Sequence, residues 1–198
     1  VGSEMCIRDR AHADSLDEQR SRYAQIKQAW DSRQMDVVNQ LMPTLTTYPL
    51  YPYLQYRQIT DDLMNQPALV VTNFIAANPT LPPARSLKSR FVNELARRSD
   101  WRGLLAFSPD KPTGTEAQCN YYYAKWNVGQ AQEAWDGAKA LWLSGKSQPN
   151  ACDQLFGAWR ASGQQDPLAY LERIRLAMKA GNTSLVRVLA QQMPADLS

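Results

Sequence analysis

Hydrophobic side chains recur at the three- and four-residue spacing of a single helix face through most of this chain. Four such stripes are Leu16, Tyr23, Ile26 and Trp30; Ala117, Tyr121, Ala124 and Val128; Ala131, Trp135, Ala138 and Trp142; and Leu168, Leu171, Arg175 (through its aliphatic stem) and Met178. Ser15 and Thr115 are placed to cap helix N-termini, and Gly129 and Gly181 to end helices in left-handed turns. The only β-branched run, residues 69–72, lies inside a segment of helical length. The pattern therefore predicts helices and no sheet.

Turn-forming residues divide the chain at regular intervals. Clusters of Gly, Pro, Asn, Asp and Ser recur about every 13 to 19 residues, so two intervals sum to about 33, the length of a two-helix solenoid repeat. Ala124, Gly129 and Ala134 fall where tetratricopeptide-type helix pairs place small residues at close contacts. We predict an all-α fold of antiparallel helix pairs stacked as a right-handed superhelix, an α-solenoid of the tetratricopeptide type.

Composition and charge exclude several functions. The 198 residues are 44% hydrophobic and 21% charged, which is typical of a globular chain. The net charge of +3 is too small to indicate nucleic-acid binding, and no apolar run approaches the roughly 20 residues of a membrane span. The single histidine excludes a His-pair metal site, and no glycine-rich phosphate loop occurs. We predict no cofactor and no metal.

The first thirteen residues differ in character from the rest. Residues 1–10 are charged and aperiodic, and we interpret them as a foreign, artefactual leader; a disordered native N-terminus is the alternative. Residues 11–13, Ala-His-Ala, match the small-x-small end of a signal peptide, which would make Asp14 the first mature residue. His12 and Cys6 would then both be absent from the mature protein.

The carboxylates are the first residues to consider as catalytic acids or bases. Asp61 and Asp62 are adjacent, so on a helix they point about 100° apart and cannot flank one scissile bond. Four glutamates lie among Lys, Arg or Gln at helical spacing: Glu94, Glu116, Glu133 and Glu172. Each is interpreted as a surface ion-pair partner rather than an acid of raised pKa. We therefore predict no catalytic residue in this chain.

The aromatic residues are candidates for ligand binding or for the core, and two cysteines are candidates for a disulfide. Tyrosines interleaved with prolines could stack on sugar rings, although such rings more often pack with exposed hydroxyls; they are Tyr48, Tyr51, Tyr53 and Tyr56. The five tryptophans after Trp30 are mostly core candidates. Cys119 and Cys152 lie 33 residues apart, about one helix pair, and can form a disulfide if their Cβ vectors agree; two buried free thiols are the alternative.

Five continuous segments resemble a known family. They are DSLDEQRSRY (14–23), YPLYPYL (48–54), NPTLPPAR (78–85), WRGLLAF (101–107) and CNYYYAKW (119–126). With the sequence that surrounds them, they resemble the N-terminal region of the large soluble lytic murein transglycosylases of enteric bacteria. The resemblance extends over residues 11–198. It implies that residues 14–198 form the N-terminal part of a doughnut-shaped superhelical scaffold in a longer periplasmic enzyme.

The resemblance also implies an activity for the longer enzyme. A lone glutamate in a lysozyme-like domain protonates the glycosidic oxygen between N-acetylmuramic acid and N-acetylglucosamine, and the muramoyl C6 hydroxyl closes on C1 to give a 1,6-anhydro product. The family's catalytic motifs have no counterpart here, so the catalytic domain is expected to be absent and no catalytic residue is carried over. The family's disulfide maps onto Cys119 and Cys152.

The expected partners follow from the same resemblance. They are peptidoglycan glycan strands, reached through the full-length enzyme, and periplasmic cell-wall proteins. The alternative is a self-sufficient helical-repeat module for protein–protein interaction in the periplasm. A third possibility, an independently active enzyme, predicts anhydromuropeptide release by residues 14–198 alone, and we expect none.

Overall fold

The structure, a computed structural model, describes residues 14–193. Within that range every regular element is a helix, as the sequence pattern predicted. The chain divides into two compact units, one ending at Asp61 and the other beginning at Asp62. The foreign leader (1–10) and signal-peptide end (11–13) predicted from the sequence lie outside the described residues.

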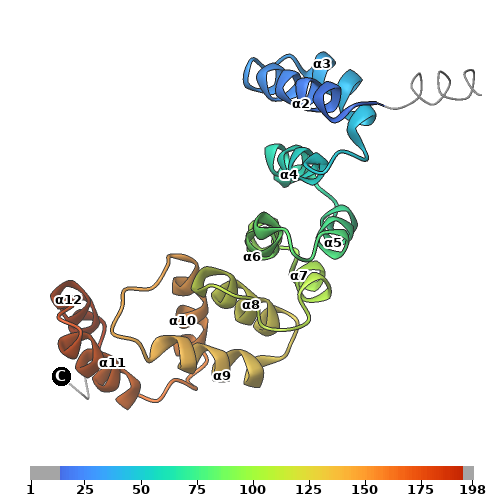
Figure 1. The fold of residues 1–198 in the computed structure, drawn as a ribbon. Coiled ribbons are helices and arrows are strands. Elements are labelled where there is room, and N and C mark those ends of the chain that lie inside the picture. The colour runs from blue at the N-terminus through green and yellow to red at the C-terminus, as the bar shows by residue number, and fades with distance from the viewer. Residues whose placement is uncertain (1–13, 194–198) are drawn as a thin grey trace, which may run out of the picture. The chain divides into compact units, whose positions relative to one another are not determined.

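Over residues 14–61, the described part of the first unit has three α-helices and a 3-10 turn. They are α2 (Leu16–Asp31), α3 (Met35–Leu41), η1 (Met42–Leu45) and α4 (Tyr51–Asp61) (Figure 1). The Ser15 hydroxyl accepts a hydrogen bond from the Glu18 amide at 3.1 Å and caps α2, as predicted. Ile26, Trp30, Leu45 and Leu54 are almost fully buried, and they form the core between α2, η1 and α4.

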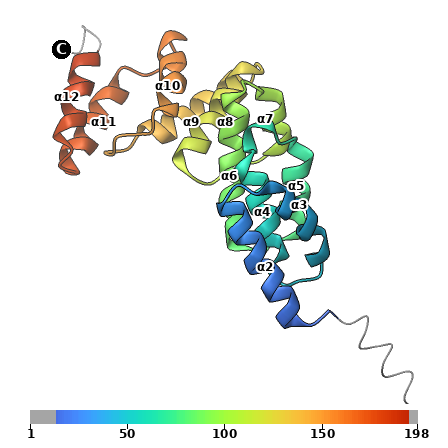
Figure 2. The same cartoon turned by 90° about the horizontal axis from the view of Figure 1, so that it is seen from above.

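The second unit continues with paired helices. They are η2 (Leu63–Asn65), α5 (Ala68–Ala77), α6 (Pro82–Arg97), α7 (Trp101–Phe107), α8 (Thr115–Asn127), α9 (Ala131–Trp142), α10 (Ala151–Ala161), α11 (Leu168–Lys179) and α12 (Thr183–Gln192) (Figure 2). Helices α8 and α9 pack tightly together, α10 packs against α8, and α11 pairs with α12. Each helix thus contacts its neighbours in sequence or the equivalent helix of the next pair, as expected of stacked helix pairs.

Small residues allow α8 and α9 to approach closely. Ala124, Ala134 and Ala138 have no exposed surface, and Gly137 lies against the ring of Tyr122. Gly129 ends α8 with a φ of 89°, a conformation that favours glycine, as predicted from the turn pattern; it is exposed and does not lie at the close helix contact that was also expected of it. Trp142 of α9 lies in the core of this unit, and its ring packs edge-on against Phe156, Trp159 and Tyr170.

Helix ends follow the sequence signals with one exception. Gly181 ends α11 with a φ of 72°, as predicted. The Thr115 cap is wrong: Thr115 is the first helical residue of α8, Gly114 is the N-cap residue, and no side chain caps this terminus. The Gln118 side chain instead donates to the Pro112 carbonyl at 3.1 Å, so the expected capping-box partner is used by the preceding loop.

Helix α11 buries a different face from the one that its predicted hydrophobic stripe indicated. Leu168, Leu171 and Met178 of α11 are exposed, at 55%, 37% and 66% of their surface. The buried face of this helix is made instead by Ala169, Tyr170, Arg173 and Ala177. On the buried face, Tyr170 supplies the large ring and Arg173 is a charged residue. Leu168, Leu171 and Met178 lie on the exposed face. No helix within residues 14–193 has both the length and the apolar content needed to cross a membrane.

Candidate functional site

The two cysteines of the helical region form a disulfide. Cys119 in α8 and Cys152 in α10 are fully buried and bonded, with their Cα atoms 5.0 Å apart. Helices α8 and α10 pack against each other, which brings the two sulfur atoms within bonding distance. The predicted bridge is confirmed, and the alternative of two free thiols is wrong.

The four candidate sugar-stacking tyrosines do not share one environment. Tyr48 is buried in the core of the first unit, and its ring packs on Tyr23 with centroids 5.4 Å apart. Tyr51 and Tyr56 are half-buried in α4, whereas Tyr53 is 39% exposed. Tyr53 therefore presents the largest accessible ring surface of the four.

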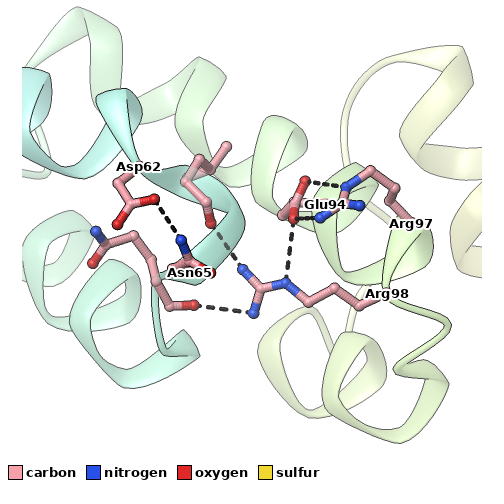
Figure 3. Close-up of polar contacts among 7 residues, drawn as sticks. Asp62, Asn65, Glu94, Arg97 and Arg98 are labelled. Carbon is pink, nitrogen blue, oxygen red and sulfur yellow. Dashed lines mark hydrogen bonds and ion pairs between the residues drawn. The ribbon is translucent and has the colours of Figure 1, made fainter.

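Glu94 belongs to a polar network in which Arg98 joins the end of α6 to η2 (Figure 3). Its carboxylate accepts from Arg97 at 2.6 and 3.0 Å and from Arg98 at 3.3 Å. These hydrogen bonds, that from Arg97 foremost, lower the pKa of Glu94 below its ordinary value. Arg98 also donates to the Leu63 and Gln66 carbonyls at 2.8 and 3.1 Å. The network ties η2 to α6 and keeps Glu94 ionised, which suits a structural ion pair and not a general acid.

The other candidate carboxylates are also occupied by structural contacts or exposed. Asp61 accepts a hydrogen bond from the indole of Trp30, and Asp62 accepts from the Asn65 amide at 2.7 Å. Glu133 pairs with Lys125 at 2.8 Å, and this contact raises the pKa of Lys125. Glu116 and Glu172 are exposed, and neither forms an ion pair among residues 14–193, so the pairing predicted for these two is not found. The predicted ion pairs are confirmed for Glu94 and Glu133, although the Glu94 side chain, at 12% exposure, is more buried than a surface residue.

An aromatic row that sequence reasoning missed crosses three helices. Trp101 of α7, Tyr123 and Trp126 of α8, and Trp135 of α9 form it. Successive ring centroids are 5.2, 5.4 and 6.3 Å apart. Trp135 is buried, but Trp126 is 38% exposed, and Trp101 and Tyr123 are half-buried. The partly exposed rings of this row are flat apolar surfaces on which a ligand can stack. Its three tryptophans were expected to be mostly core, because periodicity alone cannot distinguish a ring buried between helices from a ring that is partly exposed.

Comparisons with known proteins match the chain to one kind of enzyme. No family model matches it. It is 83% identical over 186 residues to the soluble lytic murein transglycosylase of Escherichia coli K12, a match that covers 94% of this chain and 29% of the relative. It is 75% identical over 199 residues to the protein of the same name from Salmonella typhimurium, covering 99% of this chain and 31% of the relative. The chain is similar to one part of a soluble lytic murein transglycosylase.

Solved transglycosylase structures share the fold. The crystal structure of the 70 kDa soluble lytic transglycosylase of Escherichia coli matches with a TM-score of 0.91 at 84% identity, over 92% of this chain and 30% of that one. An inactive mutant of the Pseudomonas aeruginosa lytic transglycosylase Slt matches with a TM-score of 0.80 at 36% identity, over 88% and 28%. The resemblance and the all-α fold predicted from the sequence are both confirmed. The chain spans slightly under a third of the length of these transglycosylases.

Proposed function

We propose that residues 14–198 form part of the helical scaffold of a periplasmic lytic murein transglycosylase. The observation that carries this proposal is the 83% identity to the Escherichia coli transglycosylase over 94% of the chain, together with the TM-score of 0.91 to the solved enzyme. At such identity, equivalent helices pack through nearly the same side chains. We therefore expect this chain to have the same role as the matching segment of the Escherichia coli enzyme.

The chemistry proposed for the whole enzyme is cleavage of the β-1,4 bond between N-acetylmuramic acid and N-acetylglucosamine with formation of the 1,6-anhydromuramoyl product. We assign this step to a lysozyme-like catalytic domain outside the present chain. Two features support the assignment: Glu94 is held ionised by two arginines, and Glu133 is paired with Lys125. A general acid instead needs a raised pKa and access to the glycosidic oxygen.

The proposed contribution of the scaffold is to hold glycan strands of peptidoglycan. Sugar rings have apolar faces that stack on aromatic side chains, and the partly open row of Trp101, Tyr123 and Trp126 provides such a surface. Tyr53, the most exposed of the four tyrosines, is a second candidate contact, together with the half-buried Tyr51 and Tyr56; Tyr48 is buried and is left out. Periplasmic cell-wall proteins are the other proposed partners.

Export to the periplasm is part of the same proposal. The buried Cys119–Cys152 disulfide supports it, because such bonds persist in oxidising compartments. We propose that residues 1–10 are foreign, that residues 11–13 end a signal peptide, and that Asp14 begins the mature protein. N-terminal sequencing of the protein exported from its natural gene should start at Asp14; a start elsewhere would contradict the assignment.

The decisive experiment is a chimera. Residues 14–193 replace the matching segment of the Escherichia coli enzyme, and release of 1,6-anhydromuropeptides from purified sacculi is measured by chromatography. We expect the chimera to be active and residues 14–198 alone to release nothing. Release by the chain alone, or an inactive chimera with the helical content of the parent enzyme, would overturn the proposal.

A second candidate function is a self-sufficient helical-repeat module that binds proteins. It is favoured by the exposed apolar residues of α11 and α12, among them Leu168, Met178 and Val188. In a stacked array the same residues would be covered by a further helix pair. The chimera distinguishes the two, because a self-sufficient module would not support murein cleavage in place of the native segment.

A further inference from the structure

Arg173 is a buried cation without an acidic partner. The residue lies on the inward face of α11 and is only 4% exposed. None of the ion pairs among residues 14–193 involves it. Buried arginines are normally paired, because an uncompensated charge in a protein interior is costly. This burial lowers the pKa of the guanidinium from its ordinary value, although the group remains charged at neutral pH.

The contacts that hold Arg173 leave its hydrogen-bonding capacity largely unused. The guanidinium lies 4.4 Å from the ring centroid of Trp142 and 5.5 Å from that of Phe156. Nη2 donates one long hydrogen bond of 3.4 Å to the Lys146 carbonyl, and Nε has no acceptor. The aromatic rings fix the plane of the guanidinium, so an acceptor can approach its N–H edge without reorienting the side chain.

Arg173 lines a cavity among α9, α10, α11 and α12 of the second unit. The cavity measures about 490 Å³, within the range of small-molecule sites. Its polar lining includes Ser147, Gln148 and Ser184, and Phe156 and Leu189 contribute apolar surface. A lining that combines polar and apolar side chains suits a ligand with an ionic head and a short carbon body.

The charges around the cavity favour an anion. Arg160 also lines it and lies with its guanidinium 5.6 Å from the ring of Tyr170. Asp153 is the one acidic residue in the lining; its negative charge favours the protonated form of Arg173, but it forms no ion pair with it. The cavity lining therefore contains two guanidinium groups and one carboxylate, which gives it a net positive charge.

We propose that this cavity binds a carboxylate-bearing small molecule. The ligand carboxylate pairs with the planar fork of Arg173, which matches two parallel N–H···O bonds. The hydroxyls and amide of the lining hold the rest of the polar head, and the carbon body rests on Phe156 and Leu189. The site is separate from the proposed transglycosylase function, and its test does not use murein cleavage.

Binding is tested on the full 198-residue chain by NMR, with the indole N–H of Trp142 as the reporter, because that ring lies under the Arg173 guanidinium. N-acetyl-alanyl-alanine is titrated against its C-terminal amide, which has the same shape without the charge. We expect the acid to shift the Trp142 resonance and to bind about 10- to 100-fold more tightly than the amide. Equal affinity, or no shift with any acid used, would refute the site.

A second titration identifies the source of the carboxylate. N-acetylmuramic acid carries a carboxylate on a sugar and is compared with neutral N-acetylglucosamine. Tighter binding of the peptide acid assigns the ligand to peptides, and tighter binding of the sugar acid assigns it to glycan fragments. Both outcomes support carboxylate recognition, whereas equal binding of each acid and its neutral counterpart contradicts it.

Variants locate the binding group. R173M keeps the aliphatic stem and removes the charge, so the preference for the acid should disappear; R173K keeps a charge without the fork and should bind the acid about tenfold more weakly than the unmodified chain. R175M, which changes an exposed arginine of the same helix, is the matched control and should bind like the unmodified chain. If R173M retains the acid preference, the proposal is wrong; if R173M does not fold, the acid–amide comparison and R173K still decide.

Discussion

Gly137 of α9 lies directly beneath the ring of Tyr122, and a Cβ atom at this position would overlap that ring. Tyr122 has little freedom to move, because its ring packs edge-on against Tyr121 with centroids 5.0 Å apart. We expect Gly137→Ala to lower the free energy of unfolding by about 1 to 2 kcal/mol, since the overlap outweighs the better helix propensity of alanine.

The matched control for this substitution is Gly157→Ala in α10. Gly157 is also helical, but a Cβ atom there meets nothing within 4 Å. Alanine should therefore stabilise the chain by up to about 1 kcal/mol through helix propensity alone. Urea denaturation followed by circular dichroism measures both. Two changes of the same sign would show that the contact between Gly137 and Tyr122 does not limit the approach of α8 and α9.

The pH dependence of stability is expected to depend on Glu94. Its pKa is lowered in the folded state, first by the hydrogen bond from Arg97 and then by that from Arg98. A lowered folded-state pKa stabilises the fold above the unfolded-state value, and the stabilisation is lost as the pH falls through the folded-state value. Glu94→Gln should therefore destabilise the chain by about 1 kcal/mol at pH 7 and by much less once the pH has fallen below the folded-state pKa.

Denaturation midpoints of this variant and the unmodified chain between pH 3 and 8 provide the measurement. Glu172→Gln is the control, since Glu172 is exposed and forms no ion pair among residues 14–193. It should give a difference that does not change with pH. A pH-independent loss for Glu94→Gln would mean that shape, and not charge, makes Glu94 important.

At the scale of elements, the disulfide joins α8 to α10, two helices that pack against each other. Cys119 and Cys152 close a loop with a sequence separation of 33 inside a buried core. Constraining the unfolded chain over such a loop is worth about 3 to 4 kcal/mol. Replacing both cysteines by alanine in a Cys6→Ser chain should lower the free energy of unfolding by about that amount, measured by chemical denaturation.

Thiol titration gives an independent check of this bond. The denatured, unreduced Cys6→Ser chain should contain no free thiol, and the reduced chain should contain both. Two free thiols before reduction would show that the bond does not form. A stability loss well under 1 kcal/mol in the double alanine variant would show that helix packing alone fixes α10 against α8.

At the scale of the whole molecule, the two units have separate cores. Leu45 is fully buried in the core of the first unit, and Leu→Ala substitutions at such sites cost about 2 to 5 kcal/mol. Leu45→Ala should increase amide hydrogen exchange in α2, α3 and α4, while the amides of α8, α9 and α10 keep their protection. Equal loss of protection in both units would show that they unfold as one cooperative structure.

Individual residues show which structural features the sequence pattern predicts and which it does not. The spacing of Cys119 and Cys152 made a disulfide possible, because a two-helix repeat returns the chain to an equivalent position, but it left two buried free thiols open; the family resemblance implied the pairing. The stripe that includes Leu168 and Met178 suggested the wrong buried face for α11. Periodicity measures which residues share a face, but which face is buried depends on the helices packed against it. Arg173 could not be identified as a buried cation for the same reason.

The amino-acid sequence by itself determined the helical class, the regular alternation of helices and turns, and the resemblance to lytic transglycosylases, because these depend on spacing and on local backbone preferences. Only the tertiary structure decided that Tyr48 is core and Tyr53 accessible, that Trp101, Tyr123 and Trp126 form one row, and that Arg173 faces a cavity. These features bring together side chains from different helices, and such distances are set by packing.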